Sequence, residues 1–362
     1  MNYVIQKENR PVYLQIYKLI RNDIINQVFP FDSKLPSKRF LADELGVSTI
    51  TVEHAYALLC DEGYAEARER SGYFVIFRST DGFAASSAET VPLAHSQLEA
   101  SAYPSFSLSI LSKTIRRVLA DYQDAILRKS PNGGSTELRS AIRQYLARNR
   151  GMQVEIEQII IGSGAEYLYR LIVELLGRDK VYGIEYPSYD KIEQIYRAAQ
   201  VEYELLPLSA EGIDSSALAA ARADVLHTTP YRSFPSGVTA SASKRYEYIH
   251  WSRQAKRFIV ESDYGSEFAV SSQPMETLFV LSDLDNVIYL NTFSRTISPA
   301  IRIGYMVLPR QLVKPFQEKL GFYSCTVPTF DQLVLTELIH NGDFERHINR
   351  VRRSKRKELL PR

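Results

Sequence analysis

Two apolar runs separated by a polar break constrain the fold of this chain most strongly. The runs span residues 287–290 and 301–308, and the break between them reads NTFSRTISPA. Apolar runs of this kind are typical of buried strands. From Phe106 onward, strand-like runs alternate with helical patterns, which favours a mostly parallel sheet with helices on its faces. We therefore predict an α/β domain over residues 106–362.

The first 79 residues predict a smaller unit of a different class. Helical patterns cover Pro11–Val28 and two stretches that begin at Ser37 and Ser48, both suitable N-caps. Short strand patterns follow at 64–67 and 73–77, joined by a tight turn. Three helices followed by a hairpin form a winged helix-turn-helix. The side chains of the second and third helices that we expect to face the core are Phe40, Leu41, Leu45, Val52, Ala55, Tyr56 and Leu59.

The stretch between these regions, residues 80–105, is rich in Ser, Ala, Thr and Pro and has little periodicity. Such a composition predicts a linker between two independently folded units. We therefore divide the chain into a unit at 1–79, this linker, and a unit at 106–362. The sequence has no signal-peptide pattern and no apolar run long enough to span a membrane, so we expect a cytoplasmic protein.

Charge and cysteine content narrow the function only slightly. The net charge is +2, and the first 79 residues hold ten basic and ten acidic side chains, so bulk charge does not indicate a nucleic-acid partner. The two cysteines, Cys60 and Cys325, have no metal-ligand spacing and are expected to be free thiols. A basic helix is expected over 344–360, as a solvated helix face.

Residues 10–76, which include LPSKRFLADELGVSTITVEHAYALLCDEGY and SGYFV, resemble the GntR-type DNA-binding domain. The resemblance implies a double-stranded DNA operator as partner, with the helix after Ser48 in the major groove and the hairpin turn at the minor groove. Thr49 stands where the family usually has arginine or lysine, so we expect a weaker or different base readout. Winged helices also bind proteins, and a protein-interaction module remains the alternative for this unit. The residues that the resemblance assigns to DNA are Lys38, Arg39, Ser48, Thr49, Thr51, Arg70, Ser71 and Gly72.

The polar break at 292–296 resembles the TFSK loop of fold-type I aminotransferases, which use pyridoxal phosphate. In that family the last residue of the quartet is the lysine that forms a Schiff base with the cofactor, and here it is Arg295. A guanidinium stays protonated and has no free lone pair with which to attack an aldehyde. The resemblance, with this substitution, implies a domain without catalytic residues that has lost covalent cofactor chemistry.

Further segments resemble the same family in the same order. The GSGA segment at 162–165, after a strand at 159–161, resembles the turn that holds the cofactor phosphate at a helix start. Ser262 replaces the aspartate that pairs with the ring nitrogen, and Asp263 next to it is expected to point to the other face of its strand. The residues that the resemblance assigns to this degenerate pocket are Ser163, Gly164, Ala165, Tyr189, Tyr264, Thr292, Arg295 and Arg302.

A winged helix, a linker and an aminotransferase-like domain in this order resemble the MocR subfamily of GntR regulators. The resemblance implies a sequence-specific transcription regulator, a head-to-tail homodimer, and a large domain for effector binding or dimerisation. Pyridoxal phosphate enters by resemblance only: covalent attachment is not expected, and non-covalent cofactor or another small anion stays open. The family's small C-terminal domain is expected to be absent or truncated. The alternative is a pyridoxal-phosphate-dependent transaminase with a fused binding module.

Overall fold

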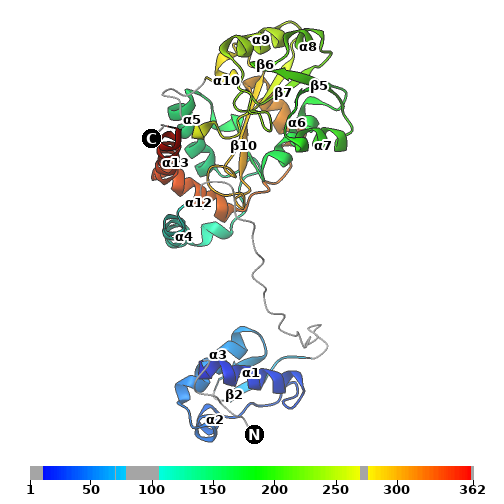
Figure 1. Cartoon of the computed structure of the whole chain (residues 1–362). Helices are drawn as coiled ribbons and strands as arrows, with labels where there is room; N and C mark the ends of the chain where they lie inside the picture. The colour runs from blue at the N-terminus through cyan, green and yellow to red at the C-terminus, as the bar shows by residue number, and fades with distance from the viewer. Residues whose placement is uncertain (1–10, 70, 79–105, 270–275, 360–362) are drawn as a thin grey trace. The chain divides into compact units, whose positions relative to one another are not determined.

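The chain divides into two compact units, Met1–Leu98 and Glu99–Arg362, in the computed structural model (Figure 1). The structure describes residues 11–69, 71–78, 106–269 and 276–359. The expected linker at 80–105 and the wing residue Arg70 lie outside these ranges. Within them, none of the helices has the length and apolar character needed to cross a membrane.

The first unit is a winged helix-turn-helix, as the sequence predicts. Its elements are α1 (Val12–Ile25), α2 (Lys38–Leu45), α3 (Thr49–Asp61) and the antiparallel strands β1 (Ala65–Arg68) and β2 (Gly72–Val75). The Ser37 side chain accepts a hydrogen bond from the Phe40 N–H at the start of α2. The Ser48 side chain accepts one from the Thr51 N–H at the start of α3. Both predicted N-caps are confirmed, and each fixes the first turn of its helix.

An apolar stripe from all three helices forms the core of this unit. Its members are Ile16, Ile20, Ile24, Leu41, Val52, Ala55, Tyr56 and Leu59. The prediction for Phe40 is wrong, because this side chain is 59% exposed. Leu41 and Leu45 share one face of α2, whereas Phe40 precedes that row by one residue, about 100° around the helix. Helix α1 also ends three residues before the predicted Val28.

The second unit is built around a sheet that has eight strands within the described residues. In spatial order they are β3 (Ile159–Gly162), β10 (Gly304–Val307), β9 (Val287–Thr292), β8 (Phe258–Ser262), β7 (Val225–Thr228), β4 (Val181–Tyr186), β5 (Glu202–Ser209) and β6 (Gly212–Ile213). Strands β9, β8, β7, β4 and β5 are parallel, β10 is antiparallel to both of its neighbours, and β6 is antiparallel to β5. The predicted mostly parallel α/β sheet is confirmed.

Helices cover both faces of this sheet (Figure 1). They are α4 (Leu108–Tyr122), α5 (Thr136–Arg150), α6 (Ala165–Leu176), α7 (Asp190–Ala198), α8 (Ser215–Ala220), α9 (Ala242–Arg253), α10 (Leu278–Leu281), α11 (Arg310–Leu320), α12 (Thr329–His340) and α13 (Asp343–Leu359). Tyr289 of β9 packs in the core with α5, α12 and α13, whereas Ile288 and Leu290 pack in the core with α6, α7 and α11. Successive side chains of a strand point to opposite faces, so this central strand is apolar on both.

Candidate functional site

The N-terminal turn of α3 is the candidate nucleic-acid interface. Ser48 and Thr49 are exposed there, and Thr51 is half-buried. The Ser48 Oγ and Thr51 Oγ1 atoms lie 2.7 Å apart, and Ser48 also caps the Thr51 N–H. These two hydroxyls therefore hold the helix start in shape. Thr49 presents its side chain to solvent beside them.

Ile50, which sequence reasoning missed, is 65% exposed on the same turn. An apolar side chain on a helix in the major groove contacts the methyl group of thymine. Its position in the sequence was a usable signal, because Ile50 lies outside the buried stripe that begins at Val52. Thr49 and Ile50 together form the exposed tip of α3.

The cations expected on DNA phosphates differ in their surroundings. Lys38 Nζ lies 2.8 Å from Glu53 Oε1, so its charge is balanced within the unit. Arg39 beside it is exposed. At the wing, Ser71 and Gly72 are exposed, and a Cβ built on Gly72 would lie 3.1 Å from Lys34 Cε. Lys34, another residue that sequence reasoning missed, thus adds a cation next to the wing turn.

The degenerate pocket begins at the turn from β3 to α6. Ser163, Gly164 and Ala165 form this turn, and Gly164 is the N-cap residue with a φ of 93°. A Cβ built on Gly164 would lie 2.8 Å from Arg302 Nη2, so only a glycine lets the turn approach this guanidinium so closely. The structure thus brings the helix start and Arg302 together.

Arg302 forms an ion pair with Glu166, which lies in the first turn of α6. Arg302 Nη2 lies 2.6 Å from Glu166 Oε2, and Lys191 Nζ lies 3.1 Å from Glu166 Oε1. Partial burial raises the pKa of Glu166, but hydrogen bonds from its own N–H, from Lys191 and from Arg302 lower it below the ordinary value. Glu166 is therefore a carboxylate at neutral pH. Sequence reasoning missed it, although an acidic residue directly after the GSGA segment was visible.

Thr292 ends β9 on the face that carries Ile288 and Leu290, which is the α6 side of the sheet. The residue is 7% exposed, and its Oγ1 has no hydrogen-bond partner among the described residues. A buried hydroxyl without a partner is costly unless something else bonds it. The Thr292 hydroxyl is thus available to bond a ligand.

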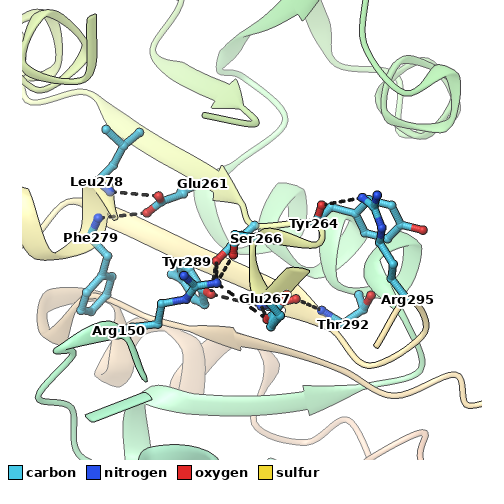
Figure 2. A network of polar contacts seen from close by, with 12 residues as sticks. Arg150, Glu261, Tyr264, Ser266, Glu267, Leu278, Phe279, Tyr289, Thr292 and Arg295 are labelled. Atoms are coloured by element: carbon cyan, nitrogen blue, oxygen red, sulfur yellow. Dashed lines mark hydrogen bonds and ion pairs between the residues drawn. The ribbon is translucent and has the colours of Figure 1, made fainter. Parts of the chain in front are cut away.

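Arg295 lies over the ring of Tyr264, as Figure 2 shows. Its guanidinium carbon is 5.0 Å from the ring centroid, and its Nη1 donates a 3.0 Å hydrogen bond to the Tyr264 carbonyl oxygen. A Cβ built on Gly265 would lie 2.5 Å from Arg295 Nη1, so the guanidinium packs against this turn as well. The structure thus brings Arg295 and Tyr264 together, with the cation on the ring face.

Ser262 lies in a closed group of neutral side chains at the end of β8. Its Oγ lies 2.8 Å from His227 Nε2 and 3.0 Å from the Tyr169 hydroxyl, and His227 Nδ1 lies 2.8 Å from the Tyr196 hydroxyl. Burial lowers the pKa of His227 to about 3, so its imidazole is neutral at physiological pH. No carboxylate therefore stands where the resemblance places the partner of a ring nitrogen.

Asp263 points to the opposite face, as expected from strand alternation. Its Oδ2 lies 2.9 Å from Arg150 Nη2 and accepts a 2.7 Å hydrogen bond from the Tyr289 hydroxyl. Arg150 also donates to Ser266, and Glu267 Oε1 lies 3.9 Å away (Figure 2). The group formed by Arg150, Asp263, Ser266 and Glu267 is called the buried ion cluster below. It lies on the side of the sheet remote from α6.

Tyr189 is the N-cap residue of α7 and is 38% exposed. Its ring centroid lies 5.9 Å from Lys191 Nζ and 6.3 Å from the Phe234 centroid, in edge-on geometry. Through Lys191 it lies next to the Glu166 carboxylate. The structure therefore brings Tyr189 to the same side of the pocket as the helix start.

These contacts do not fit pyridoxal phosphate. Gly164 and the unbonded Thr292 hydroxyl suit a phosphate, but the Glu166 carboxylate already binds the cation that would hold it. Arg295 offers no nucleophilic amine, and Ser262 offers no carboxylate for a pyridinium. The residues therefore do not fit the aldehyde and the ring nitrogen of the cofactor, and a carboxylate occupies the cation that its phosphate would need.

Comparison with known proteins places both units. Residues 12–75 match the family described as "Bacterial regulatory proteins, gntR family", and residues 97–359 match "Aminotransferase class I and II". The HTH-type transcriptional regulator YdeL of Bacillus subtilis is 32% identical over 361 residues, which cover 96% of this chain and 77% of YdeL. The probable rhizopine catabolism regulatory protein MocR of Rhizobium meliloti is 25% identical over 95% of this chain and 74% of MocR.

Among solved structures, a kynurenine aminotransferase of Pyrococcus horikoshii resembles the chain with a TM-score of 0.63 and 26% identity. The similarity covers 70% of this chain and 66% of that one, so the chain spans slightly less than two thirds of the solved aminotransferase. The expected resemblance to MocR-type regulators is confirmed at the level of the two domains and their order. The chain belongs to the HTH-type transcriptional regulators in which a gntR-family DNA-binding unit precedes an aminotransferase class I and II domain.

Proposed function

We propose that this protein is a sequence-specific DNA-binding transcription regulator that acts as a head-to-tail homodimer. Its aminotransferase-like domain serves dimerisation and effector binding and has lost covalent pyridoxal-phosphate chemistry. The observation that carries the proposal is the exposed tip of α3, where Thr49 and Ile50 stand on a helix start held by the Ser48 cap. This tip belongs to the unit that matches the gntR family.

The charge of the DNA-binding unit supports a dimer. Among the described residues, Lys38 is paired with Glu53, whereas Arg39 and Lys34 are exposed cations next to the helix tip and the wing. Two phosphate contacts per subunit would neutralise about four phosphates in a dimer, which corresponds to a slope of about −4 in log affinity against log salt. A single unit would bind with about half of that slope and correspondingly weakly.

Gel-shift and fluorescence-anisotropy titrations with DNA from upstream of the protein's own gene test this proposal. Arg39→Ala should weaken binding to all sequences and reduce the salt slope by about 1 per subunit, since Arg39 contacts a phosphate. Thr49→Ala and Ile50→Ala should change the preferred sequence instead. Lys18→Ala is the matched control, because Lys18 is exposed on α1. Salt-insensitive retardation, or equal effects of Arg39→Ala and Lys18→Ala, would contradict DNA binding by this surface.

The loss of covalent chemistry rests on Arg295, which stands where the family's lysine is expected. The full chain is incubated with pyridoxal phosphate, reduced with borohydride, and digested for mass spectrometry. We expect no label on the peptide that contains Arg295, because a guanidinium forms no reducible imine under these conditions. Surface lysines provide the internal positive control for the reaction. A label on Arg295 would refute this part of the proposal.

The rival function is a pyridoxal-phosphate-dependent transaminase with a fused binding module. The similarity to solved aminotransferases favours it, because their fold is shared over 70% of the chain. Incubation with pyridoxal phosphate, an amino acid and an oxo acid distinguishes the two. Turnover above that of free pyridoxal phosphate would support the enzyme, and we expect none, because the Arg295 guanidinium cannot form the imine with the cofactor.

A further inference from the structure

Glu166 stands at the position where the start of α6 would otherwise face an external anion. The first N–H groups of a helix have no partners within the helix and favour negative charge. One of these donors is the N–H of Glu166 itself, which hydrogen-bonds the Glu166 side chain. The carboxylate therefore uses the same features of the helix start that a phosphate would use.

Two cations from distant parts of the chain complete the contact. Arg302 precedes β10 and Lys191 lies in α7, and each binds a different oxygen of Glu166. The side chain of Glu166 is 26% exposed, and those of Arg302 and Lys191 are 51% and 52% exposed. Partly exposed ion pairs of this kind are weak and exchange with solvent. The Glu166 carboxylate can therefore dissociate from Arg302 and Lys191.

A second, independent observation indicates that the site suits more than a carboxylate. Thr292 lies on the α6 face of the sheet, and its buried Oγ1 has no partner among the described residues. A carboxylate offers two oxygens, both of which Glu166 uses on Arg302 and Lys191. A phosphate monoester has three terminal oxygens, one more than Glu166 provides. Thr292 lies opposite Gly304, two residues from Arg302, and Gly304 lies opposite Gly162 before the start of α6, so a third oxygen bound there would give the Thr292 hydroxyl an acceptor.

We propose that Glu166 is an internal competitor that occupies the phosphate cup formed by the start of α6, Arg302, Lys191 and Thr292. A phosphate monoester or inorganic phosphate binds this cup only when it displaces the Glu166 carboxylate from Arg302. The fraction of protein with bound phosphate therefore depends on how strongly the ligand competes with Glu166 for Arg302. The inference concerns the large domain alone and does not depend on DNA binding.

The test measures anion binding by the full-length chain. Pyridoxine 5′-phosphate and inorganic phosphate are the probes, since neither has an aldehyde that would react with surface lysines. Isothermal titration calorimetry on the wild type and on Glu166→Gln should show binding that is at least about ten-fold tighter in the variant. The substitution removes the competing charge and keeps a side chain of the same size. Glu174→Gln is the matched control, because Glu174 lies on the same helix and pairs with Arg170.

Second substitutions locate the bound phosphate. In the Glu166→Gln background, Arg302→Gln should abolish the gained binding, and Thr292→Val should weaken it several-fold. Pyridoxine without the phosphate should bind none of the variants more tightly than the wild type. If Glu166→Gln unfolds, as judged by circular dichroism, Glu166→Ala replaces it, because alanine also removes the competing carboxylate.

Three outcomes would overturn the inference. Equal affinity of the wild type and Glu166→Gln would mean that the carboxylate does not compete. Tighter binding in Glu174→Gln as well would assign the effect to net charge. Absence of binding in every variant would show that the Glu166 pairs are only structural. Failure of DNA binding in the gel-shift experiment would leave all of these measurements unaffected.

Discussion

Removal of Arg150 from the buried ion cluster should destabilise the large domain more than any surface substitution of similar size. The Arg150 side chain is 4% exposed, and those of Asp263 and Glu267 are 6% and 4% exposed. The substitution Arg150→Met keeps the apolar volume and removes the only cation that binds these two carboxylates among the described residues. Breaking a buried pair by removing one partner costs about 3–5 kcal/mol, because the other charge stays buried without compensation.

Arg148 provides a matched control on the same turn of α5. Its side chain is 51% exposed and lies 2.9 Å from Glu345 Oε1, whose side chain is 31% exposed. Exposed pairs contribute about 0–1 kcal/mol, so Arg148→Met should cost at most about 1 kcal/mol. Both variants remove one arginine from the same helix, so the difference between their losses in free energy of unfolding measures the effect of burial.

Urea unfolding of the full chain, followed by tryptophan fluorescence, measures the loss. The sequence has a single tryptophan, Trp251, which is 4% exposed on α9, so the signal reports on the large domain alone. Burial and the neighbouring Asp263 raise the pKa of Glu267, and Arg150 lowers it. In Arg150→Met the folded-state pKa of Glu267 should rise further.

A folded state that binds more protons than the unfolded state loses stability as the pH rises. The defect of Arg150→Met should therefore be smaller at about pH 5 than at about pH 8. A loss below about 1 kcal/mol at both pH values, or a loss equal to that of Arg148→Met, would refute the argument from buried charge. A double variant, Arg150→Met with Asp263→Asn, should recover part of the stability because one uncompensated charge is gone.

Two further predictions concern other buried or capping groups. Burial lowers the pKa of His227 from 6.5 to about 3, so the folded state binds fewer protons than the unfolded state between these values and loses stability as the pH falls. Between about pH 7.5 and about pH 5, the free energy of unfolding of the wild type should fall by about 2 kcal/mol more than that of His227→Asn. Urea unfolding with Trp251 fluorescence measures both values. Equal losses would count against a buried neutral imidazole. In the first unit, Ser37→Ala removes the oxygen that accepts the Phe40 N–H and should cost about 1 kcal/mol, measured by the thermal transition of the tyrosine near-UV signal. The exposed Ser71→Ala should leave that transition unchanged, and a similar shift in both variants would argue against capping.

Local patterns predicted most of the fold. The strands at 159–161 and 287–290 were visible because both faces of each strand are covered, which keeps every position apolar. The caps at Ser37 and Ser48 were visible because capping depends on residues within three positions of each other. Phe40 was misplaced because α2 is only eight residues long, and so short a helix leaves the angle of its buried face poorly defined by periodicity.

The residues that the resemblance assigns to the degenerate pocket could be read from the sequence, but their partners in the structure could not. Glu166 meets Arg302 across 136 positions and Lys191 across 25. His227 meets Ser262 across 35 positions. Such pairs depend on which strands are neighbours and on which face a side chain lies. A local sequence pattern contains neither of these properties.

Strand β8 separates the buried ion cluster from the residues that the resemblance assigns to a cofactor pocket. Asp263 and the rest of the buried ion cluster lie on the α5 side of the sheet, where removal of a charge is costly. Ser262 and Thr292 lie on the α6 side, where Ser262 bonds His227 and Glu166 bonds Arg302. A change on the α6 side leaves the cluster intact, because adjacent side chains of a strand point to opposite faces. We therefore expect substitutions at Ser262 or Thr292 to change the free energy of unfolding less than Arg150→Met does.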